Sequence, residues 1–369
     1  MSEAPDRELQ RLTEQVRSAI ASRQLLEIRG GGTKHFYGGE PIGDVLDIRP
    51  LRGISSYEPS ELVVTVRAGT PLSELEAALA EKGQCLPFEP PRFASREGPG
   101  GTVGGMVAAG LAGPARAAVG GVRDYVLGAT LLNGKAELLS FGGQVMKNVA
   151  GYDVSRVLAG SLGIFGVICE VSLKVLPIAP AQATLRLELD APTALRKLNE
   201  WGGQPLPLNA SAWWDGMLVI RLAGAQAAVQ AAREKIGGEL IAPAAAEPFW
   251  LGLRDHRDEF FVGAAKAVEG GASLWRLSVP ATAGPLKLSG EQLLEWGGAQ
   301  RWICTSAPAA TLRDVAAVVG GHAVLVRGRD KAAGTFAPLK PPLDRIHREL
   351  KLAFDPQRLF NPGRLIPAL

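Results

Sequence analysis

The chain has 369 residues, of which 46% are hydrophobic and 21% charged, and its 40 basic and 37 acidic residues leave a net charge of +3. This length and composition favour a soluble globular protein of two domains, and the balanced charge argues against a nucleic-acid-binding protein. No apolar run approaches the roughly 20 residues of a membrane-spanning helix and the charged N-terminus lacks a signal-peptide core, so we expect no transmembrane segment and a cytoplasmic protein.

The first part of the chain alternates between patterns typical of helices and of strands. Apolar residues recur at helical spacing over residues 8–21 and predict an amphipathic helix. A glycine turn at residues 30–33 follows the first predicted strand. The expected elements around this turn are strands at 25–29, 45–48 and 62–67 and a helix that begins at Pro71.

Residues 98–121 are the most glycine-rich stretch, with nine glycines in twenty-four positions. Glycine costs conformational entropy when ordered but lets backbone N–H groups approach a ligand closely, so this stretch indicates a backbone lying against something large and flat or anionic. Asn133-Gly134 then predicts a hairpin. The remaining expectations are hairpin strands at 125–132 and 136–140, irregular structure at 145–152, a short helix at 154–158 and a strand at 165–175.

A Pro-Ile-Ala-Pro run at 177–180 indicates a domain boundary. Between 184 and 328, strand–helix–strand patterns occur in two weakly similar halves, which predicts a small α+β domain with an antiparallel, ferredoxin-like sheet. A final helix is expected from Pro342. All tryptophans of the chain lie in this later region, and we interpret them as core residues or interface anchors: Trp201, Trp213, Trp214, Trp250, Trp275, Trp296 and Trp302.

Three glycine segments, at 30–33, 98–121 and 160–166, indicate one extended, phosphate-bearing cofactor. No P-loop is present, and the dinucleotide fingerprint G-x-G-x-x-G fails because Val103 and His35 replace its last glycine. Backbone N–H groups of the loops remain as a concave nest for a pyrophosphate, with Thr33 and Lys34 as further donors. The alternative for any single segment is a turn with nothing bound.

In order, these motifs resemble a known family. They are Arg-Gly-Gly-Gly-Thr-Lys at 29–34, Gly-Gly-Thr-Val-Gly-Gly-Met-Val-Ala-Ala-Gly at 100–110, Arg-Asp-Tyr-Val-Leu-Gly at 123–128, Lys-Asn-Val-Ala-Gly-Tyr-Asp at 147–153, Gly-Ser-Leu-Gly-Ile-Phe-Gly at 160–166 and Asn-Pro-Gly at 361–363. The series is similar to the FAD-binding domain of the vanillyl-alcohol oxidase / p-cresol methylhydroxylase (PCMH) superfamily. Within it, the length and the 147–153 motif most resemble the FAD-binding E subunit of bacterial glycolate oxidase.

The resemblance implies an α+β fold: a two-subdomain PCMH-type FAD-binding domain over 1–178, a smaller ferredoxin-like α+β cap or docking domain over 181–330, and a C-terminal segment, 340–369, that completes the FAD domain. It also implies the cofactor-binding residues, with Asn361 near the flavin ring, although an ordinary turn remains the alternative for Asn-Pro-Gly. These residues are Gly30, Gly31, Gly32, Thr33, Lys34, Gly101, Thr102, Gly104, Gly105, Ala109, Gly110, Ser161, Gly163, Gly166, Ile168 and Asn361.

Two departures from the family matter. Many relatives tether FAD through a histidine at the position of Thr33, and His35 is two residues late, so we expect non-covalent FAD. Relatives that oxidise 2-hydroxy acids carry a His/Glu cluster, often metal-linked, whereas His256, His322 and His347 each stand alone. We therefore assign no catalytic residue and expect no metal. The run Arg-Asp-His-Arg at 254–257 offers carboxylate-binding arginines, but we favour a solvated helix face.

The leading hypothesis is a non-covalent FAD subunit of a multi-subunit 2-hydroxy-acid dehydrogenase, with glycolate oxidase as the first candidate. Cys85, Cys169 and Cys304 lack cluster spacing. Electrons from the oxidation of glycolate to glyoxylate would therefore leave through a partner. The resemblance implies that the partners are a second FAD subunit and an iron–sulfur subunit, with peripheral membrane association through them. The alternatives are a self-sufficient FAD oxidoreductase with an unidentified substrate and an FAD-stabilised assembly subunit without turnover.

Overall fold

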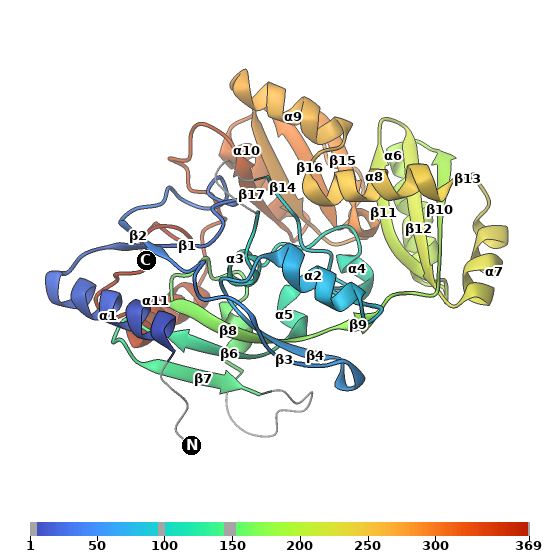
Figure 1. The fold of residues 1–369 in the computed structure, drawn as a ribbon. Helices are drawn as coiled ribbons and strands as arrows, with labels where there is room; N and C mark the ends of the chain where they lie inside the picture. Colours follow the sequence, from blue (N-terminus) through green and yellow to red (C-terminus); the bar gives the residue numbers. More distant parts are fainter. Residues whose placement is uncertain (1–5, 95–99, 144–152, 368–369) are drawn as a thin grey trace.

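The computed structural model describes residues 6–94, 100–143 and 153–367. Gly98 of the glycine-rich stretch, the predicted irregular segment 145–152 and most of the 147–153 motif lie outside these ranges. The helices and strands of the first half lie beside a large sheet built from later residues (Figure 1). The α+β class predicted from the sequence is confirmed.

A five-stranded antiparallel sheet forms the centre of the first half. Its strand order is β3-β4-β8-β6-β7, and β8 is buried along most of its length. The predicted hairpin around Asn133 is present as β6 and β7, and the predicted helix at 154–158 is a short 3-10 helix at Ser155–Leu158. The strands are β3 (Ile54–Glu58), β4 (Val63–Arg67), β6 (Val126–Leu132), β7 (Leu138–Gly142) and β8 (Val167–Lys174), and helices α2 (Leu72–Ala80), α3 (Val103–Ala109) and α5 (Val122–Tyr125) pack on them.

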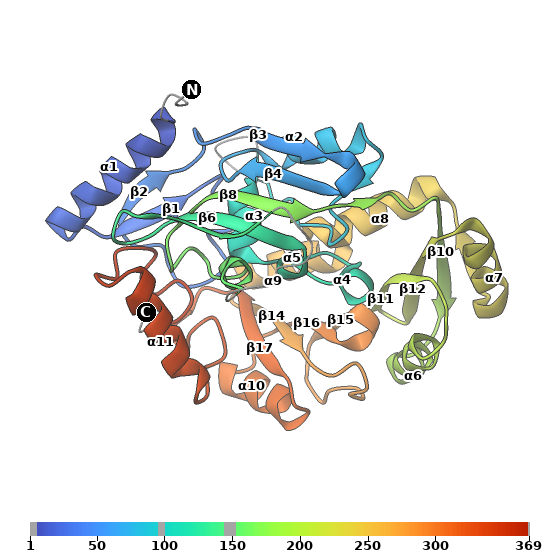
Figure 2. The same cartoon turned by 90° about the horizontal axis from the view of Figure 1, so that it is seen from below.

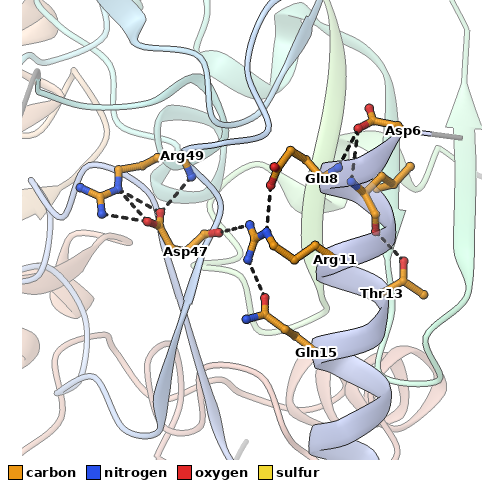
Figure 3. A network of polar contacts seen from close by, with 8 residues as sticks. Asp6, Glu8, Arg11, Thr13, Gln15, Asp47 and Arg49 are labelled. Atoms are coloured by element: carbon orange, nitrogen blue, oxygen red, sulfur yellow. Dashed lines mark hydrogen bonds and ion pairs between the residues drawn. The ribbon is translucent and has the colours of Figure 1, made fainter. Parts of the chain in front are cut away.

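A separate parallel pair, β1 (Leu26–Arg29) and β2 (Asp44–Asp47), carries the first glycine turn. The predicted N-terminal helix is present as α1 (Arg7–Ser22), which buries one apolar face and is capped by Asp6, whose carboxylate accepts from the Glu8 and Leu9 N–H groups. Arg11 of α1 donates to the carbonyl of Asp47 at 3.0 Å and so connects the helix to the end of β2 (Figure 3).

The eight-stranded sheet lies within residues 181–327, has the order β13-β10-β12-β11-β15-β16-β14-β17, and is antiparallel at every strand pair. Each half repeats the strand order of a ferredoxin-like unit, and the halves join through β11 and β15. The strands are β10 (Ala181–Glu188), β11 (Leu208–Trp214), β12 (Met217–Gly224), β13 (Glu239–Ile241), β14 (Ser273–Ser278), β15 (Glu291–Glu295), β16 (Gln300–Thr305) and β17 (His322–Arg327).

The two faces of this sheet are covered differently. Helices α6 (Ala191–Gly202), α7 (Gln226–Ile236) and α10 (Ala309–Val318) pack on one face. The other face packs against α8 (Pro243–Asp255), α9 (Glu259–Glu269) and residues of the glycine-rich half, including Tyr37 and Ala109. This second face therefore adjoins the part of the molecule where the glycine segments meet.

Most tryptophans are core residues rather than interface anchors. Trp201, Trp250, Trp275 and Trp302 are between 3% and 7% exposed. The half-buried Trp213, Trp214 and Trp296 each donate their indole N–H to a protein oxygen, namely the Leu189 carbonyl, the Glu291 carboxylate and the Gly113 carbonyl. The interface-anchor interpretation is wrong for Trp250, because its side chain is enclosed and bonded to Thr184.

The C-terminal segment returns to the first half with helix α11 (Leu343–Phe354) (Figure 2), and Phe360 after this helix forms a bridge with Leu26 of β1. Fully buried Lys351 donates to the Asp355 carboxylate and to the carbonyls of Ile164 and Phe360. These contacts fix the stretch that carries Asn361 against β1. Among the described residues, no helix is long and apolar enough to cross a membrane.

Candidate cofactor-binding site

A cavity opens where β1, the start of α3, the turn at 160–166 and the C-terminal segment meet, and it encloses about 790 Å³ of empty space up to its open mouth. These four segments are far apart in the sequence. Most of the predicted cofactor-binding residues line this cavity: Gly30, Gly31, Gly32, Thr33, Lys34, Thr102, Gly104, Gly105, Ala109, Gly163, Gly166, Ile168 and Asn361. Gly101, Gly110 and Ser161 do not line it.

The glycines around the cavity make room for different neighbours. A Cβ on Gly31 would lie 1.8 Å from the Gly100 carbonyl oxygen, and a Cβ on Gly104 would lie 2.6 Å from the Ala68 Cβ and 3.0 Å from the Ala68 carbonyl oxygen. These two glycines therefore permit close approach of protein segments to one another. A Cβ on Gly105 would meet only the Thr102 hydroxyl, at 3.2 Å. Gly105 therefore keeps cavity space open without such crowding.

Asn361 joins the two sides of the cavity wall. Its side-chain oxygen accepts from the Ile28 N–H at 2.8 Å, and its side-chain nitrogen donates to the Leu162 carbonyl at 2.6 Å. Asn361 also has a positive φ of 44° and is 6% exposed. The Asn-Pro-Gly motif thus fixes β1 relative to the 160–166 turn.

Arg364 shapes the loop after the first glycine turn, and sequence reasoning missed it. Its guanidinium is buried and donates to the carbonyl oxygens of Lys34, His35, Tyr37 and Gly39. Four backbone acceptors on one side of the loop are thereby satisfied by one side chain. The only sequence signal for this role is an arginine directly after the Asn-Pro-Gly motif.

Charged side chains surround the mouth of the cavity. Glu27, which is 7% exposed, pairs with Arg29 at 2.6 Å and with the His35 imidazole at 3.1 Å. Burial lowers the pKa of Lys34 to about 8, so this side chain is a cation held in a poorly solvated place. The other lining residues not predicted from the sequence are Ile28, Ile48, Ala108 and Leu162.

The Arg-Asp-His-Arg run is not a solvated helix face throughout. Arg254 and Arg257 both pair with Asp255 at 2.8 Å, and the Arg254 side chain is only 12% exposed. These arginines are therefore engaged by a carboxylate of the protein. His256 stacks on Phe261 with ring centroids 3.9 Å apart. Burial and the nearby Arg327 and Arg276 lower the pKa of His256 to about 3, so its imidazole is neutral at physiological pH.

The histidines lie apart in the fold, as they do in the sequence. His322 starts β17 and His347 lies on α11, where its Nδ1 is 2.8 Å from the Leu343 carbonyl oxygen. Across 6–94, 100–143 and 153–367, no group of three or more His, Cys, Asp or Glu side chains forms a candidate metal site. The described part of the chain thus offers no histidine cluster from which to assign a catalytic base.

Comparisons with known proteins agree on a flavoprotein fold. Residues 7–142 match the FAD binding domain family. The glycolate oxidase subunit GlcE of Escherichia coli (strain K12) is 46% identical over 360 residues, which are 98% of this chain and 98% of that protein. The glycolate oxidase subunit GlcD of Bacillus subtilis (strain 168) is 30% identical over 159 residues, which are 42% of this chain and 33% of that protein.

Solved structures extend the likeness to the whole fold. Alkyldihydroxyacetonephosphate synthase superposes with a TM-score of 0.63, covering 96% of this chain and 75% of that protein. At 16% sequence identity, this likeness concerns the fold alone. It includes the large sheet as well as the glycine-rich half, because nearly all of the chain is superposed.

Proposed function

We propose that this chain, which belongs to the family of the glycolate oxidase subunit GlcE, holds FAD in the glycine-lined cavity. With this cofactor it acts as an FAD-dependent oxidoreductase subunit of a glycolate oxidase. The observation that carries the assignment of the site is the convergence of three glycine segments and Asn361 on one cavity. FAD supplies hydride and electron transfer, while the protein binds and orients it.

The cavity wall fits a pyrophosphate-bearing cofactor. Lys34 lines it as a partly desolvated cation, and its Nζ lies 3.3 Å from the Thr33 hydroxyl, so two donors stand together beside the glycine turn. We assign residues 30–34 to the pyrophosphate and Gly105 and Ala109 to the backbone that lies along the cofactor. Gly101, Gly110 and Ser161 stand outside the cavity lining, and we assign them to shaping the loops behind it.

We propose that the FAD is not covalently tethered. The position that bears a tethering histidine in many relatives is Thr33, and His35 is engaged with Glu27. The purified chain is expected to be yellow, and acid precipitation is expected to release all of its flavin as FAD rather than FMN. Flavin that stays with the precipitate would contradict the non-covalent assignment, and a colourless chain that cannot be reconstituted with FAD would contradict the site itself.

The finer partner assignment is also a proposal. We infer a complex with a second FAD subunit and an iron–sulfur subunit, and a docking role for the region 181–330, with 1–178 and 340–369 forming the FAD domain. The three cysteines are free, which suits a reducing compartment such as the cytoplasm, where the partners would provide any contact with the membrane. Co-purification of the native complex with flavin and iron counts for each subunit tests this composition.

A further inference from the structure

An apolar cluster that contains Tyr37 connects the wall of the FAD cavity to the eight-stranded sheet. The Tyr37 side chain is 4% exposed and belongs to the same apolar cluster as the cavity-lining Ala109 and Leu162 and the sheet residues Trp302 and Val324. Residues on this face of β14, β16 and β17 therefore adjoin the rim of the cavity. Any group bound there would lie between the sheet and the cofactor site.

Three cations gather at this rim, and we call Lys34, Arg276 and Arg327 the cation cluster. Arg276 of β14 donates to the Tyr37 hydroxyl at 3.0 Å. The guanidinium carbon of Arg327, at the end of β17, lies 3.6 Å from the centroid of the Phe36 ring.

Aromatic rings connect Lys34 to Arg327. The Phe36 and Phe93 ring centroids are 5.1 Å apart, and Lys34 Nζ lies 5.8 Å from the Phe93 centroid. The imidazole of His256 also contacts the Phe93 ring, with centroids 5.0 Å apart. Lys34 and Arg327 thus lie against one aromatic patch made by Phe36, Phe93 and His256, whereas Arg276 contacts Tyr37.

The positive charge of this cluster is uncompensated in the described part of the chain. Among residues 6–94, 100–143 and 153–367, no carboxylate forms an ion pair with any of the three cations, whereas Arg29, Arg221 and Arg254 each have one. The Nε of Arg276 is buried and has no hydrogen-bond partner in the part of the chain that the structure describes. An unpaired buried charge is costly, so a site built this way favours an anion.

The positive charge of the cluster also lowers the pKa of neighbouring titratable groups. Burial, followed by the charge of Arg276, lowers the pKa of the Arg116 guanidinium and of the His322 imidazole. The neutral state of His256 has the same origin, with Arg327 and Arg276 adding to the effect of burial. The positive charge of Arg276 thus affects three titratable groups on different elements, Arg116, His256 and His322.

We propose that Arg276 and Arg327, next to the Tyr37 hydroxyl, form a binding site for the carboxylate of a small organic acid beside the FAD cavity, while Lys34 stays with the pyrophosphate. Arginine offers planar paired N–H donors that match a carboxylate, and the aromatic patch holds the Arg327 guanidinium in place. This inference rests on the proposed function, since the acid of that reaction class is a 2-hydroxy acid. The FAD pyrophosphate is the other anion that this cluster has within reach, and the test separates the two.

The experiment uses the full chain loaded with FAD, titrated calorimetrically with glycolate and with oxalate, and with glycolamide as the uncharged control. We expect both acids to bind and glycolamide not to bind. Arg276→Met and Arg327→Met should each weaken acid binding about ten- to hundredfold, the range for a hydrogen bond to a charged group. Arg345→Met is the matched control, because Arg345 is 76% exposed on α11, and it should leave acid binding unchanged.

The FAD dissociation constant of each variant distinguishes the two anions. It should stay within about twofold of the parent value, and a loss of FAD affinity in Arg276→Met or Arg327→Met would assign the cluster to the cofactor and overturn the proposal. Failure of a yellow, FAD-loaded parent chain to bind oxalate would also overturn it. A chain that binds no FAD would instead contradict the proposed function.

Thermal unfolding measurements distinguish a loss of acid binding from a folding defect in the variants. Removing one of several unpaired like charges should leave the melting temperature of the acid-free chain unchanged or raise it, while the rise that oxalate produces in the parent should disappear. If a methionine variant does not fold, Arg276→Lys is used to test the proposal instead. This variant keeps the positive charge and should retain part of the rise in melting temperature that oxalate produces. Equal oxalate responses in Arg276→Lys, Arg327→Lys and the parent would count against arginine-specific recognition.

Discussion

The glycines that line the cavity differ in whether they can be substituted without disturbing the fold, and this determines which of them can test FAD binding. Gly31 and Gly104 lie against the Gly100 carbonyl and Ala68, so aspartate at either position would disturb the protein whether or not FAD is present. Gly105 offers a cleaner test. It lies in the first turn of α3, where an acidic side chain suits the helix N-terminus, and its only close neighbour is the Thr102 hydroxyl.

Gly105→Asp should therefore fold and yet lose FAD, because its carboxylate would occupy cavity space and repel the pyrophosphate. We expect at least a hundredfold weaker FAD binding, on the order of 3 kcal/mol, with a far-ultraviolet circular dichroism spectrum like that of the parent. Gly263→Asp is the control, since Gly263 is exposed on α9 with open space around it. Full flavin occupancy in Gly105→Asp would show that α3 does not lie along the cofactor.

Arg364 allows a second prediction at this scale. Arg364→Met leaves the carbonyls of Lys34, His35, Tyr37 and Gly39 without their donor, and unsatisfied buried groups cost about 1–3 kcal/mol each. We expect a loss of roughly 2–4 kcal/mol in unfolding free energy and weaker FAD binding, with Arg364→Lys restoring part of both. Urea titration and flavin fluorescence measure them. Unchanged FAD affinity in Arg364→Met would mean that the loop keeps its shape without the guanidinium.

The site residues that stand within a recognisable sequence motif could be predicted. The site residues that act by contacting the backbone or side chain of a distant segment could not. Thr33, Lys34 and Asn361 stand within recognisable motifs and do line the cavity. The roles of Arg364 and Glu27 depend on loop carbonyls and a histidine that only the folded chain brings near them. Nothing in the local sequence specifies such contacts.

At the scale of elements, β15 and β16 bury an acid that has no cationic partner among the described residues. Glu295 is 4% exposed and accepts from the Trp302 indole at 2.6 Å and the Gln300 amide at 2.9 Å. Burial outweighs these hydrogen bonds and raises the pKa of Glu295 to about 7. The folded state thus holds this proton more tightly than the unfolded state does.

The sign of the pH effect follows from that raised pKa. The stabilising contribution of the protonated Glu295 is complete below the unfolded pKa of 4.5 and is lost as pH rises to about 7. Glu295→Gln should therefore change stability little near pH 4.5 and stabilise the chain by about 2–3 kcal/mol at pH 8. Denaturant titrations at both pH values measure this, with the exposed Glu188→Gln as control. An equal effect of Glu295→Gln at both pH values would contradict the raised pKa.

Elements with a local signal were predicted well. The amphipathic pattern at 8–21 gives α1, and Asn133-Gly134 gives the β6–β7 hairpin. The joining of two ferredoxin-like halves through β11 and β15 was not predictable, because it pairs Ala212 with Glu295 across more than eighty residues with no turn between them. The bridge of Leu26 to Phe360 is another contact of this kind, since it depends on α11 returning the chain end.

At the scale of the whole molecule, the sheet does not present a row of exposed tryptophans to a partner. Trp250 is enclosed, and Trp213 is bonded to Leu189, so replacing either by alanine would act first on folding. The docking role of the region 181–330 therefore has to rest on other surfaces. The face that packs against the glycine-rich half places the cation cluster beside the cofactor cavity, which gives this region a part in ligand binding.

Binding an acid and oxidising it are separate capacities, and this chain offers features for the first. Oxidation of a 2-hydroxy acid needs a group that takes the hydroxyl proton as hydride leaves for the flavin. Around the cation cluster, the histidine nearest by ring contact is His256, whose imidazole is enclosed by Phe93, Phe261 and Trp302. A proton acceptor held among three aromatic rings is poorly placed to reach a substrate hydroxyl.

We therefore expect the isolated FAD-loaded chain to show little or no flavin bleaching when mixed with glycolate without oxygen, whereas the assembled complex should oxidise glycolate. The measurement follows the visible flavin absorption under anaerobic conditions, with dithionite as the positive control for reducibility. Binding of glycolate without bleaching would fit a subunit that needs its partners for turnover. Rapid bleaching of the isolated chain would instead make it a self-sufficient oxidoreductase, and His256 would then be the first residue to replace.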